Sequence, residues 1–150
     1  MTTYHGNRWM LRRDHNSVLQ IETESFADPW DSSELVAHLM RSDTIGLVSE
    51  HHEMIRGYVV YSLSPKVYRI QRLAVGTLWR RQGVAGQMLA RLEDKLQEIA
   101  RRTAIEIDVP ERNLPMQLLL RSRGYVATEV IDDSLGDASY RFRFSAEVLV

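Results

Sequence analysis

The clearest periodic pattern in the chain lies at residues 82–101, where apolar side chains recur at intervals of three and four. This spacing gathers them on one side of a helix and leaves charged residues on the other side. The apolar set comprises Ala85, Met88, Leu89, Leu92, Leu96 and Ile99. The pattern therefore predicts a long amphipathic helix that buries one face.

Strands are predicted where apolar residues alternate with polar ones or form short runs. Residues 67–75 alternate most clearly, with Arg69 and Gln71 in one set and Ile70 and Arg72 in the other. A polar turn at residues 50–53 separates two further predicted strands. The remaining strands are expected at residues 9–12, 44–49, 55–63, 104–109, 125–131 and 139–145.

Shorter helices are predicted between these strands. Asp14 or Asn16 caps the first, and Pro29 ends it because proline restricts the residue before it. Asp31 or Ser32 caps the second. A last helix, residues 114–123, follows Asn113 and is closed by Gly124. The order is β-α-α-β-β-β-α-β-α-β-β, so we expect one α+β domain, residues 1–150, around a mixed sheet.

Composition excludes several classes of function. The chain has 150 residues, no cysteine and a net charge of −1, so disulfides and thiolate nucleophiles are absent and a polyanion such as nucleic acid is not the expected partner. No apolar run approaches the ~20 residues of a membrane helix. The five histidines lack metal-ligand spacing, so no metal is expected. These features favour a cytoplasmic protein.

A basic, glycine-bearing turn stands between the fourth predicted strand and the long helix, with the sequence Arg80-Arg81-Gln82-Gly83-Val84-Ala85-Gly86. Glycine allows the backbone to approach a ligand closely. The free N–H groups and the dipole of a helix N-terminus favour negative charge. This turn therefore predicts a phosphate-binding site, and a pyrophosphate is the expected group.

The turn and the element order resemble the GCN5-related N-acetyltransferase (GNAT) superfamily, whose signature Gln/Arg-x-x-Gly-x-Gly/Ala stands here as Arg80-x-x-Gly83-x-Ala85. The resemblance covers residues 9–144. It implies a mostly antiparallel sheet of about seven strands, four helices, and a splayed fourth and fifth strand that hold acetyl-CoA. The implied cofactor-binding residues are Leu73, Ala74, Val75, Arg80, Arg81, Gln82, Gly83, Val84, Ala85, Gly86 and Asn113.

Within that superfamily the chain looks most like the ribosomal-protein-alanine N-acetyltransferases of the RimI type. The segment Phe26-Ala27-Asp28-Pro29-Trp30 matches their Phe-x-x-Pro-Trp, and Ile107-Asp108-Val109 with Asn113 falls where they carry Leu-Glu-Val…Asn. The resemblance implies that Asp108 is the catalytic base, that Asn113 contacts the pantetheine, and that Phe26 and Trp30 bind substrate.

Two positions depart from that pattern. The family's general acid is a tyrosine, and Leu120 occupies its place. The loop at residues 132–137 is short and acidic, without the aromatic pair that helps hold a peptide. Other tyrosines are therefore alternative proton donors: Tyr61, Tyr68, Tyr125 and Tyr140.

The residues themselves leave alternatives open. Glu106 lies two positions before Asp108 and shares its strand face, so it is the reserve catalytic residue. Both carboxylates are also explained as solvent-facing strand residues, and Asp108 is alternatively explained as the partner of an arginine. Phe26 and Trp30 are equally explained as core aromatics that pin two helices.

Three functions fit the sequence. The first is an acetyltransferase for a protein N-terminal amine, acting by direct attack in a ternary complex. The second acetylates a small amine or a lysine side chain, since the aspartates at residues 132–137 attract cations. The third is a weakly catalytic module that binds coenzyme A. A monomer or a homodimer is expected.

Overall fold

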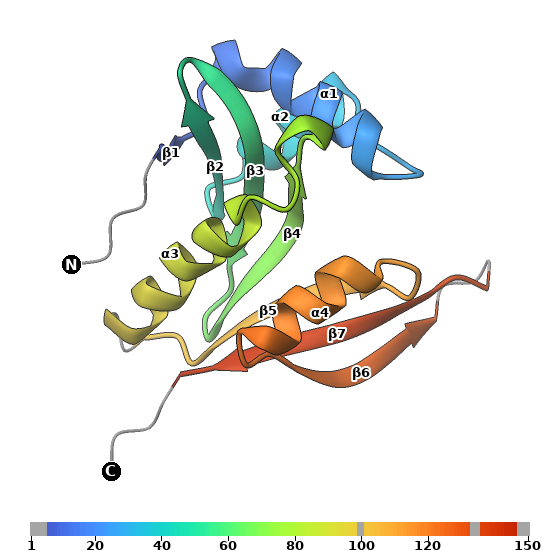
Figure 1. The fold of residues 1–150 in the computed structure, drawn as a ribbon. Helices are drawn as coiled ribbons and strands as arrows, with labels where there is room; N and C mark the ends of the chain where they lie inside the picture. Colours follow the sequence, from blue (N-terminus) through green and yellow to red (C-terminus); the bar gives the residue numbers. More distant parts are fainter. Residues whose placement is uncertain (1–5, 99–100, 133–135, 147–150) are drawn as a thin grey trace.

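A seven-stranded sheet runs through the computed structural model, which describes residues 6–98, 101–132 and 136–146 (Figure 1). The strand order is β1-β2-β3-β4-β5-β7-β6. Neighbouring strands are antiparallel except β4 and β5, which are parallel. The strands are β1 (Asn7–Trp9), β2 (Thr44–His51), β3 (Met54–Leu63), β4 (Val67–Val75), β5 (Ala104–Pro110), β6 (Val126–Asp132) and β7 (Ala138–Ser145).

Four α-helices and two 3₁₀ turns complete the described part of the chain. They are α1 (His15–Ser25), α2 (Ser32–Leu39), α3 (Val84–Glu98), α4 (Leu114–Ser122), η1 (Arg12–Asp14) and η2 (Thr77–Trp79). The element order and the mixed α+β sheet confirm the predicted fold. Two expected caps are present, since Asp31 accepts a hydrogen bond from the Glu34 N–H at 2.9 Å and Gly124 adopts a φ of +91°. The side-chain cap expected for the first helix at Asp14 or Asn16 was wrong, because Asp14 stands at the N-cap of α1 without a side-chain bond to that helix.

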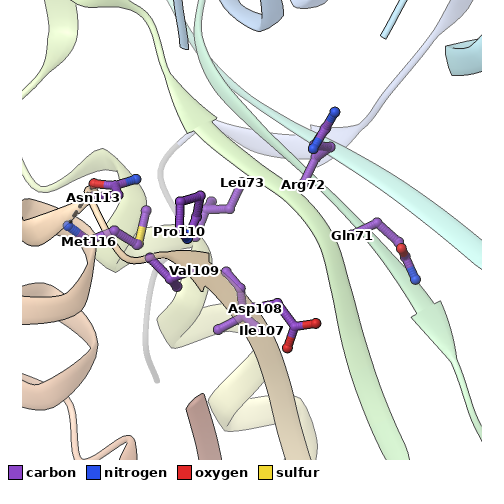
Figure 2. Close-up of a pocket in the computed structure, with 9 residues that line it drawn as sticks. All are labelled: Gln71, Arg72, Leu73, Ile107, Asp108, Val109, Pro110, Asn113 and Met116. Carbon is purple, nitrogen blue, oxygen red and sulfur yellow. Dashed lines mark hydrogen bonds between the residues drawn. The ribbon is translucent and has the colours of Figure 1, made fainter. Parts of the chain in front are cut away.

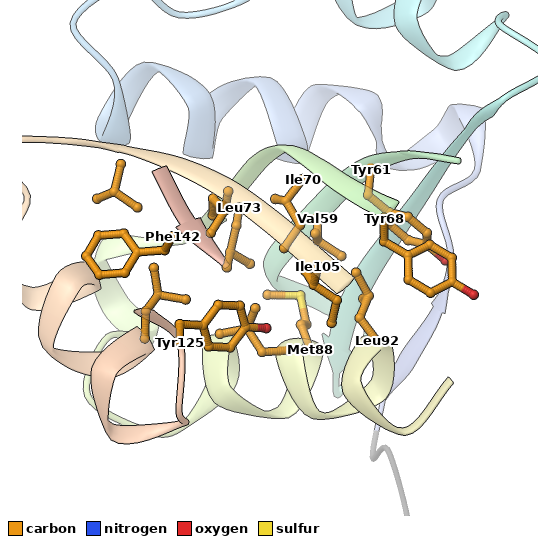
Figure 3. Close-up of a cluster of buried hydrophobic side chains, with 14 of the residues drawn as sticks. Val59, Tyr61, Tyr68, Ile70, Leu73, Met88, Leu92, Ile105, Tyr125 and Phe142 are labelled. Atoms are coloured by element: carbon orange, nitrogen blue, oxygen red, sulfur yellow. The ribbon is translucent and has the colours of Figure 1, made fainter. Parts of the chain in front are cut away.

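The helices cover the two faces of the sheet and create two apolar cores. Helix α3 buries Val84, Met88, Leu89, Leu92 and Leu96, and these pack with the strands as part of the larger core (Figure 3). Helices α1 and α2 cover the other face over β2, β3 and β4 (Figure 1). The second core lies there and contains Val18, Ile21, Leu35, Val48, Tyr58, Val60 and Ala74.

Several predicted boundaries differ from the structure by one to three residues, and two of these differences have an identifiable cause. The first strand was expected at residues 9–12 but ends at Trp9, because Asp14 accepts a hydrogen bond from the Leu11 N–H at 2.7 Å and stabilises the η1 turn instead. The long helix begins at Val84 rather than at residue 82, since Gly83 has a left-handed φ of +78°. Its expected last turn reaches residues 99 and 100, which lie outside the described residues.

A β-bulge at Gln71 changes the face of the sheet on which the following side chains of β4 lie. On β3, Tyr61 pairs with Ile70 and the preceding Val60 pairs with Arg72, so Gln71 has no partner in this register. Regular alternation predicted that Arg72 shares the face of Ile70. The extra residue reverses the alternation, as bulges do. Arg72 therefore lies on the face covered by α1 and α2.

Candidate active site

The parallel strands β4 and β5 separate halfway along their length. Their pairing runs from Val67 with Ala104 to Ile70 with Ile107 and stops there, immediately before the bulge. A small open cleft, with a volume of about 30 Å³, lies where the strands diverge (Figure 2). Its lining comprises Gln71, Arg72, Leu73, Ile107, Asp108, Val109, Pro110, Asn113 and Met116.

Residues 71–73 of β4 form one wall of this cleft, and the strand continues beyond it to Val75. Leu73 and Ala74 bury their side chains in the two cores, with 6% and 5% of each residue exposed. Since the β4–β5 ladder ends at Ile70, the backbone of residues 73–75 has no partner on β5. This wall therefore offers backbone groups to a ligand, in the manner of a strand edge.

The turn after β4 presents a helix N-terminus. Arg81 and Gly83 adopt left-handed φ values of 64° and 78°, and the N–H of Gln87 makes the first helical bond, to the Gly83 carbonyl, at 3.0 Å. The N–H groups of Val84, Ala85 and Gly86 precede this first bond, so they have no hydrogen-bond partner within the helix. A Cβ on Gly83 would meet nothing within 4 Å, so space beside the turn is open.

The side chains of the turn divide into two roles. Arg80 donates to the Val75 carbonyl at 3.1 Å and to the Ser25 hydroxyl at 3.3 Å, and Gln82 donates to the Leu78 carbonyl at 3.4 Å. These bonds fold the turn back on itself. Arg81 is exposed. The side chain of Arg80 therefore shapes the turn, and binding by this segment depends on its backbone and on Arg81.

These features fit a pyrophosphate carrier with an extended arm. Helix N–H groups and an open, left-handed turn are suited to phosphate oxygens. The unpaired edge of β4 is suited to an amide-bearing arm. Asn113 lines the cleft, and its side-chain oxygen accepts a hydrogen bond from the Met116 N–H at 3.2 Å, which caps α4.

Both candidate catalytic carboxylates are held by arginines. The two oxygens of Asp108 accept bonds from Arg141 at 2.8 and 3.1 Å, and Arg141 also reaches Glu129 at 3.2 Å. The hydrogen bonds that Arg141 donates to Asp108 raise the pKa of Arg141. Glu106 bonds to Arg69 at 2.8 Å and to Arg143 at 3.0 Å. The arginine pairing expected as an alternative for Asp108 is therefore present, and Glu106 is paired in the same way. Of the two carboxylates, Asp108 lines the cleft.

The segment with Phe26 and Trp30 is fastened to β4 by Arg72. The guanidinium carbon of Arg72 lies 4.3 Å from the ring centre of Phe26 and 4.7 Å from that of Trp30. The ring of Trp30 also stacks on His38, with ring centres 4.1 Å apart. Both aromatic rings thus contact other side chains of the protein, as the core interpretation expects. Arg72, which they contact, also lines the cleft.

A buried carboxylate completes this attachment. Glu22 is fully buried and accepts bonds from Arg72 at 3.0 Å, from the Trp30 N–H at 3.1 Å and from the Tyr58 hydroxyl at 2.5 Å. Burial and the contact with Glu22 raise the pKa of Tyr58, so its hydroxyl stays a neutral donor. Arg72 also donates to the Asp28 carbonyl at 3.1 Å.

Sequence reasoning missed Glu22, Arg72 and Arg141. Glu22 had a detectable signal, because it lies four residues after Val18 and one after Ile21, on the apolar side of α1. A carboxylate at such a position requires a buried partner. Arg72 had no comparable signal, since the bulge decides its facing.

The position of the family's acid is closed to the cleft. Leu120 is fully buried in the larger core. Among the alternative donors, Tyr61, Tyr68 and Tyr125 are also buried, and burial and the Glu93 carboxylate raise the pKa of Tyr125. Tyr140 is half-buried on β7 and pairs with Val109 of the cleft wall.

Two further searches covered the described residues alone. Within residues 6–98, 101–132 and 136–146, no three histidine, cysteine, aspartate or glutamate side chains are grouped in a way that suits a metal ion. In the same ranges, every helix is too short or too polar to cross a bilayer.

Comparison with protein families gives one match, a model described as the acetyltransferase (GNAT) family, over residues 15–125. No curated protein matches the chain significantly.

Solved structures match almost the whole chain. The ribosomal-protein-S18-alanine N-acetyltransferase from Escherichia coli has a TM-score of 0.83 at 14% identity, over 96% of this chain and 95% of that one. Arabidopsis thaliana NAA60 in complex with acetyl-CoA has a TM-score of 0.78 at 15% identity, over 93% of this chain and 98% of that one. An aminoglycoside 6'-N-acetyltransferase complexed with coenzyme A has a TM-score of 0.77 at 11% identity, over 93% of this chain and 96% of that one. At these identities the likeness establishes the fold.

Proposed function

Because the chain belongs to the acetyltransferase (GNAT) family, we propose that it transfers the acetyl group of acetyl-CoA to the α-amino group of a protein N-terminus. The observation that carries this proposal is the divergence of β4 and β5 after Ile70 and Ile107, beside the N-terminus of α3. This arrangement gives one cleft in which a thioester and an amine can meet.

The cofactor-binding residues follow from this geometry. Bound acetyl-CoA supplies the thioester that carries the acetyl group. The N–H groups at residues 81–86 and the dipole of α3 favour its pyrophosphate, and the backbone of residues 73–75 and Asn113 favour its pantetheine arm. Holding both reactants in one cleft lowers the entropic part of the barrier.

The amine must lose a proton before it attacks. An α-amino group has a reference pKa of about 7.7–8.0, against about 10.4 for lysine, so an N-terminal amine is partly neutral near pH 7. Asp108 is the proposed proton acceptor, acting directly or through one water. Arg141 takes one acceptor position on each oxygen of Asp108, and each oxygen keeps a second lone pair that can receive the proton.

The departing thiolate needs less help. Its conjugate acid has a pKa of about 8.5, with cysteine as the guide, so the thiolate can leave without full protonation. Tyr140 is the tyrosine that we propose as a donor, because it is half-buried beside Val109, whereas Leu120 has no proton to give. Water is the alternative donor.

A small cationic amine is the second candidate acceptor. Glu129 presents a side chain that is 58% exposed beside Asp108, and Asp132 and Asp137 are exposed at the adjoining strand ends. These carboxylates favour a cation over a neutral peptide.

The test is release of free coenzyme A from acetyl-CoA with a panel of acceptors. The panel contains an octapeptide that begins with alanine, the same peptide with a blocked N-terminus and one lysine, spermidine, and an aminoglycoside. Turnover with the free α-amine alone supports the proposal. Turnover with spermidine or the aminoglycoside alone selects the second candidate. No turnover above hydrolysis, with acetyl-CoA still bound, leaves a binding module and rejects the proposal.

A further inference from the structure

We propose that Arg72 is a positioning residue for the acceptor, which holds the segment at residues 26–31 against β4 and so fixes one wall of the site. The proposal rests on the proposed function, because it assigns a role in binding the amine substrate. The proposal assigns no part in this positioning to the carboxylates of Asp108 and Glu106.

The first step in the argument is the facing of Arg72. With regular alternation its side chain would share the face of Tyr68 and Ile70, inside the core under α3. The bulge at Gln71 moves it to the opposite face, at the point where the strands diverge. Figure 2 shows the guanidinium directed away from Asp108, although the residue lines the same cleft.

The second step is how Arg72 is held. Its Nε donates to Glu22 at 3.0 Å, its Nη2 donates to the Asp28 carbonyl at 3.1 Å, and its guanidinium lies over two aromatic rings. A planar guanidinium combines two directed bonds with ring stacking, whereas a lysine ammonium does not. The geometry therefore requires arginine rather than any cation.

The third step is what Arg72 controls. Glu22 also accepts a bond from the Trp30 N–H at 3.1 Å, so the carboxylate ties α1, β4 and the segment that follows α1 into one unit. Through this unit the segment keeps a fixed position relative to the cleft. Loss of Arg72 leaves Glu22 buried without its cation and frees the segment.

A second arginine provides a matched control. Arg123 donates to Glu93 at 3.0 and 2.7 Å, and Glu93 also accepts a bond from the Tyr125 hydroxyl at 3.0 Å. The arginine, glutamate and tyrosine are thus arranged as in the Arg72 unit, between α3 and the chain after α4. Arg72→Met and Arg123→Met are expected to lose comparable stability, and only the first touches the segment at residues 26–31.

The experiment measures KM for the alanine-starting octapeptide and for acetyl-CoA in both variants and in Arg72→Lys, below the melting temperature of each. For Arg72→Met we expect a rise of at least about tenfold in peptide KM with acetyl-CoA KM within twofold, and a partial return in Arg72→Lys. For Arg123→Met we expect an unchanged peptide KM. A peptide KM within twofold of wild type in Arg72→Met, or an equal rise in both KM values, overturns the proposal.

Hydrogen exchange separates this proposal from the proposed function. If the wild-type protein acetylates no amine, the proposed function and the acceptor role of Arg72 both fail. Exchange of the Trp30 amide then reports whether Arg72 holds the segment: acceleration in Arg72→Met and not in Arg123→Met supports that hold, and equal rates reject it. Wild-type activity with no change in peptide KM rejects the role of Arg72 alone.

Discussion

Asp108 is both the proposed proton acceptor and the partner of an arginine in an ion pair. It lines the cleft between β4 and β5, and Arg141 bonds to both of its oxygens. The ion pair fixes the direction of the carboxylate. In the role proposed for Asp108, the second lone pair of either oxygen would accept the proton while Arg141 stays in place.

Replacing Asp108 by asparagine tests that role. We expect kcat/KM to fall by about 10²–10⁴-fold, the usual range for loss of a general base. The loss should shrink as the pH rises, because more of the acceptor amine is then neutral without help. The measurement is the pH profile of coenzyme A release. A larger loss in Glu106→Gln than in Asp108→Asn would reassign the base to Glu106.

Leu120 is the second residue that invites a direct test. Its side chain is fully buried, whereas Leu118 on the same helix is 58% exposed. Leu120→Tyr should therefore destabilise the protein by about 1–3 kcal/mol through overpacking, with no gain in rate. Urea unfolding checks this expectation, and Leu118→Tyr, within about 0.5 kcal/mol of wild type, is the control. Faster turnover in Leu120→Tyr would show that the cleft reaches this position.

At the scale of elements, the turn before α3 is the proposed binding site for a charged group. In that role it would depend on backbone conformation more than on side chains, because Arg80 bonds to Val75 and Ser25 within the protein. The left-handed Gly83 lies where the helix begins and faces open space.

Gly83→Asp places a negative charge beside that helix N-terminus. We expect the affinity for acetyl-CoA, measured by calorimetry, to fall by roughly tenfold to a hundredfold, since like charges a few ångströms apart repel by about 1–4 kcal/mol. Gly136→Asp is the control, because Gly136 is also left-handed, with a φ of +85°, and also faces open space. Equal affinities in the two variants would contradict a phosphate site at this turn.

The bulge in β4 marks the limit of reading elements from a sequence. The strand itself was predicted with its observed ends, because its apolar positions alternate. The facing of Arg72 was not, because a bulge is decided by the pairing of Val60 and Tyr61 across the sheet. Local pattern carries information about the existence of an element, and long-range pairing decides what its side chains meet.

At the scale of the whole molecule, the fold and the location of the site were predictable and the network around the site was not. The order of elements and the turn at Gly83 follow from periodicity and glycine. The pairs formed by Glu22 with Arg72 and by Asp108 with Arg141 join residues 50 and 33 positions apart. No pattern within one element encodes such partners.

Stability in acid depends on an ion pair between residues only six positions apart. Asp14 is buried, and its hydrogen bonds from Arg8, at 2.8 and 2.9 Å, lower its pKa below the ordinary value of 3.8. A lowered pKa in the folded state means that its contribution is present above that value and is lost as the pH falls further.

Asp14→Asn should therefore lower the free energy of unfolding at pH 7 by about 2 kcal/mol, the scale of a charged hydrogen bond, and by less near pH 3. Urea unfolding at both pH values measures this difference. Asp43→Asn removes an exposed pair with Arg41 and should change little at either pH. An equal loss at pH 7 and at pH 3 in Asp14→Asn would rule out the ion pair as the cause.

The sheet is joined across its middle by a single short seam, the four residue pairs from Val67 with Ala104 to Ile70 with Ile107. A ligand that bound beyond these pairs and made contacts with both β4 and β5 would link the two halves of the sheet. Its binding energy would add to the resistance of the folded state to heat, in proportion to RT ln(1 + [L]/Kd). Binding of the cosubstrate would therefore also stabilise the contact between the two halves of the sheet, and its release would remove that stabilisation.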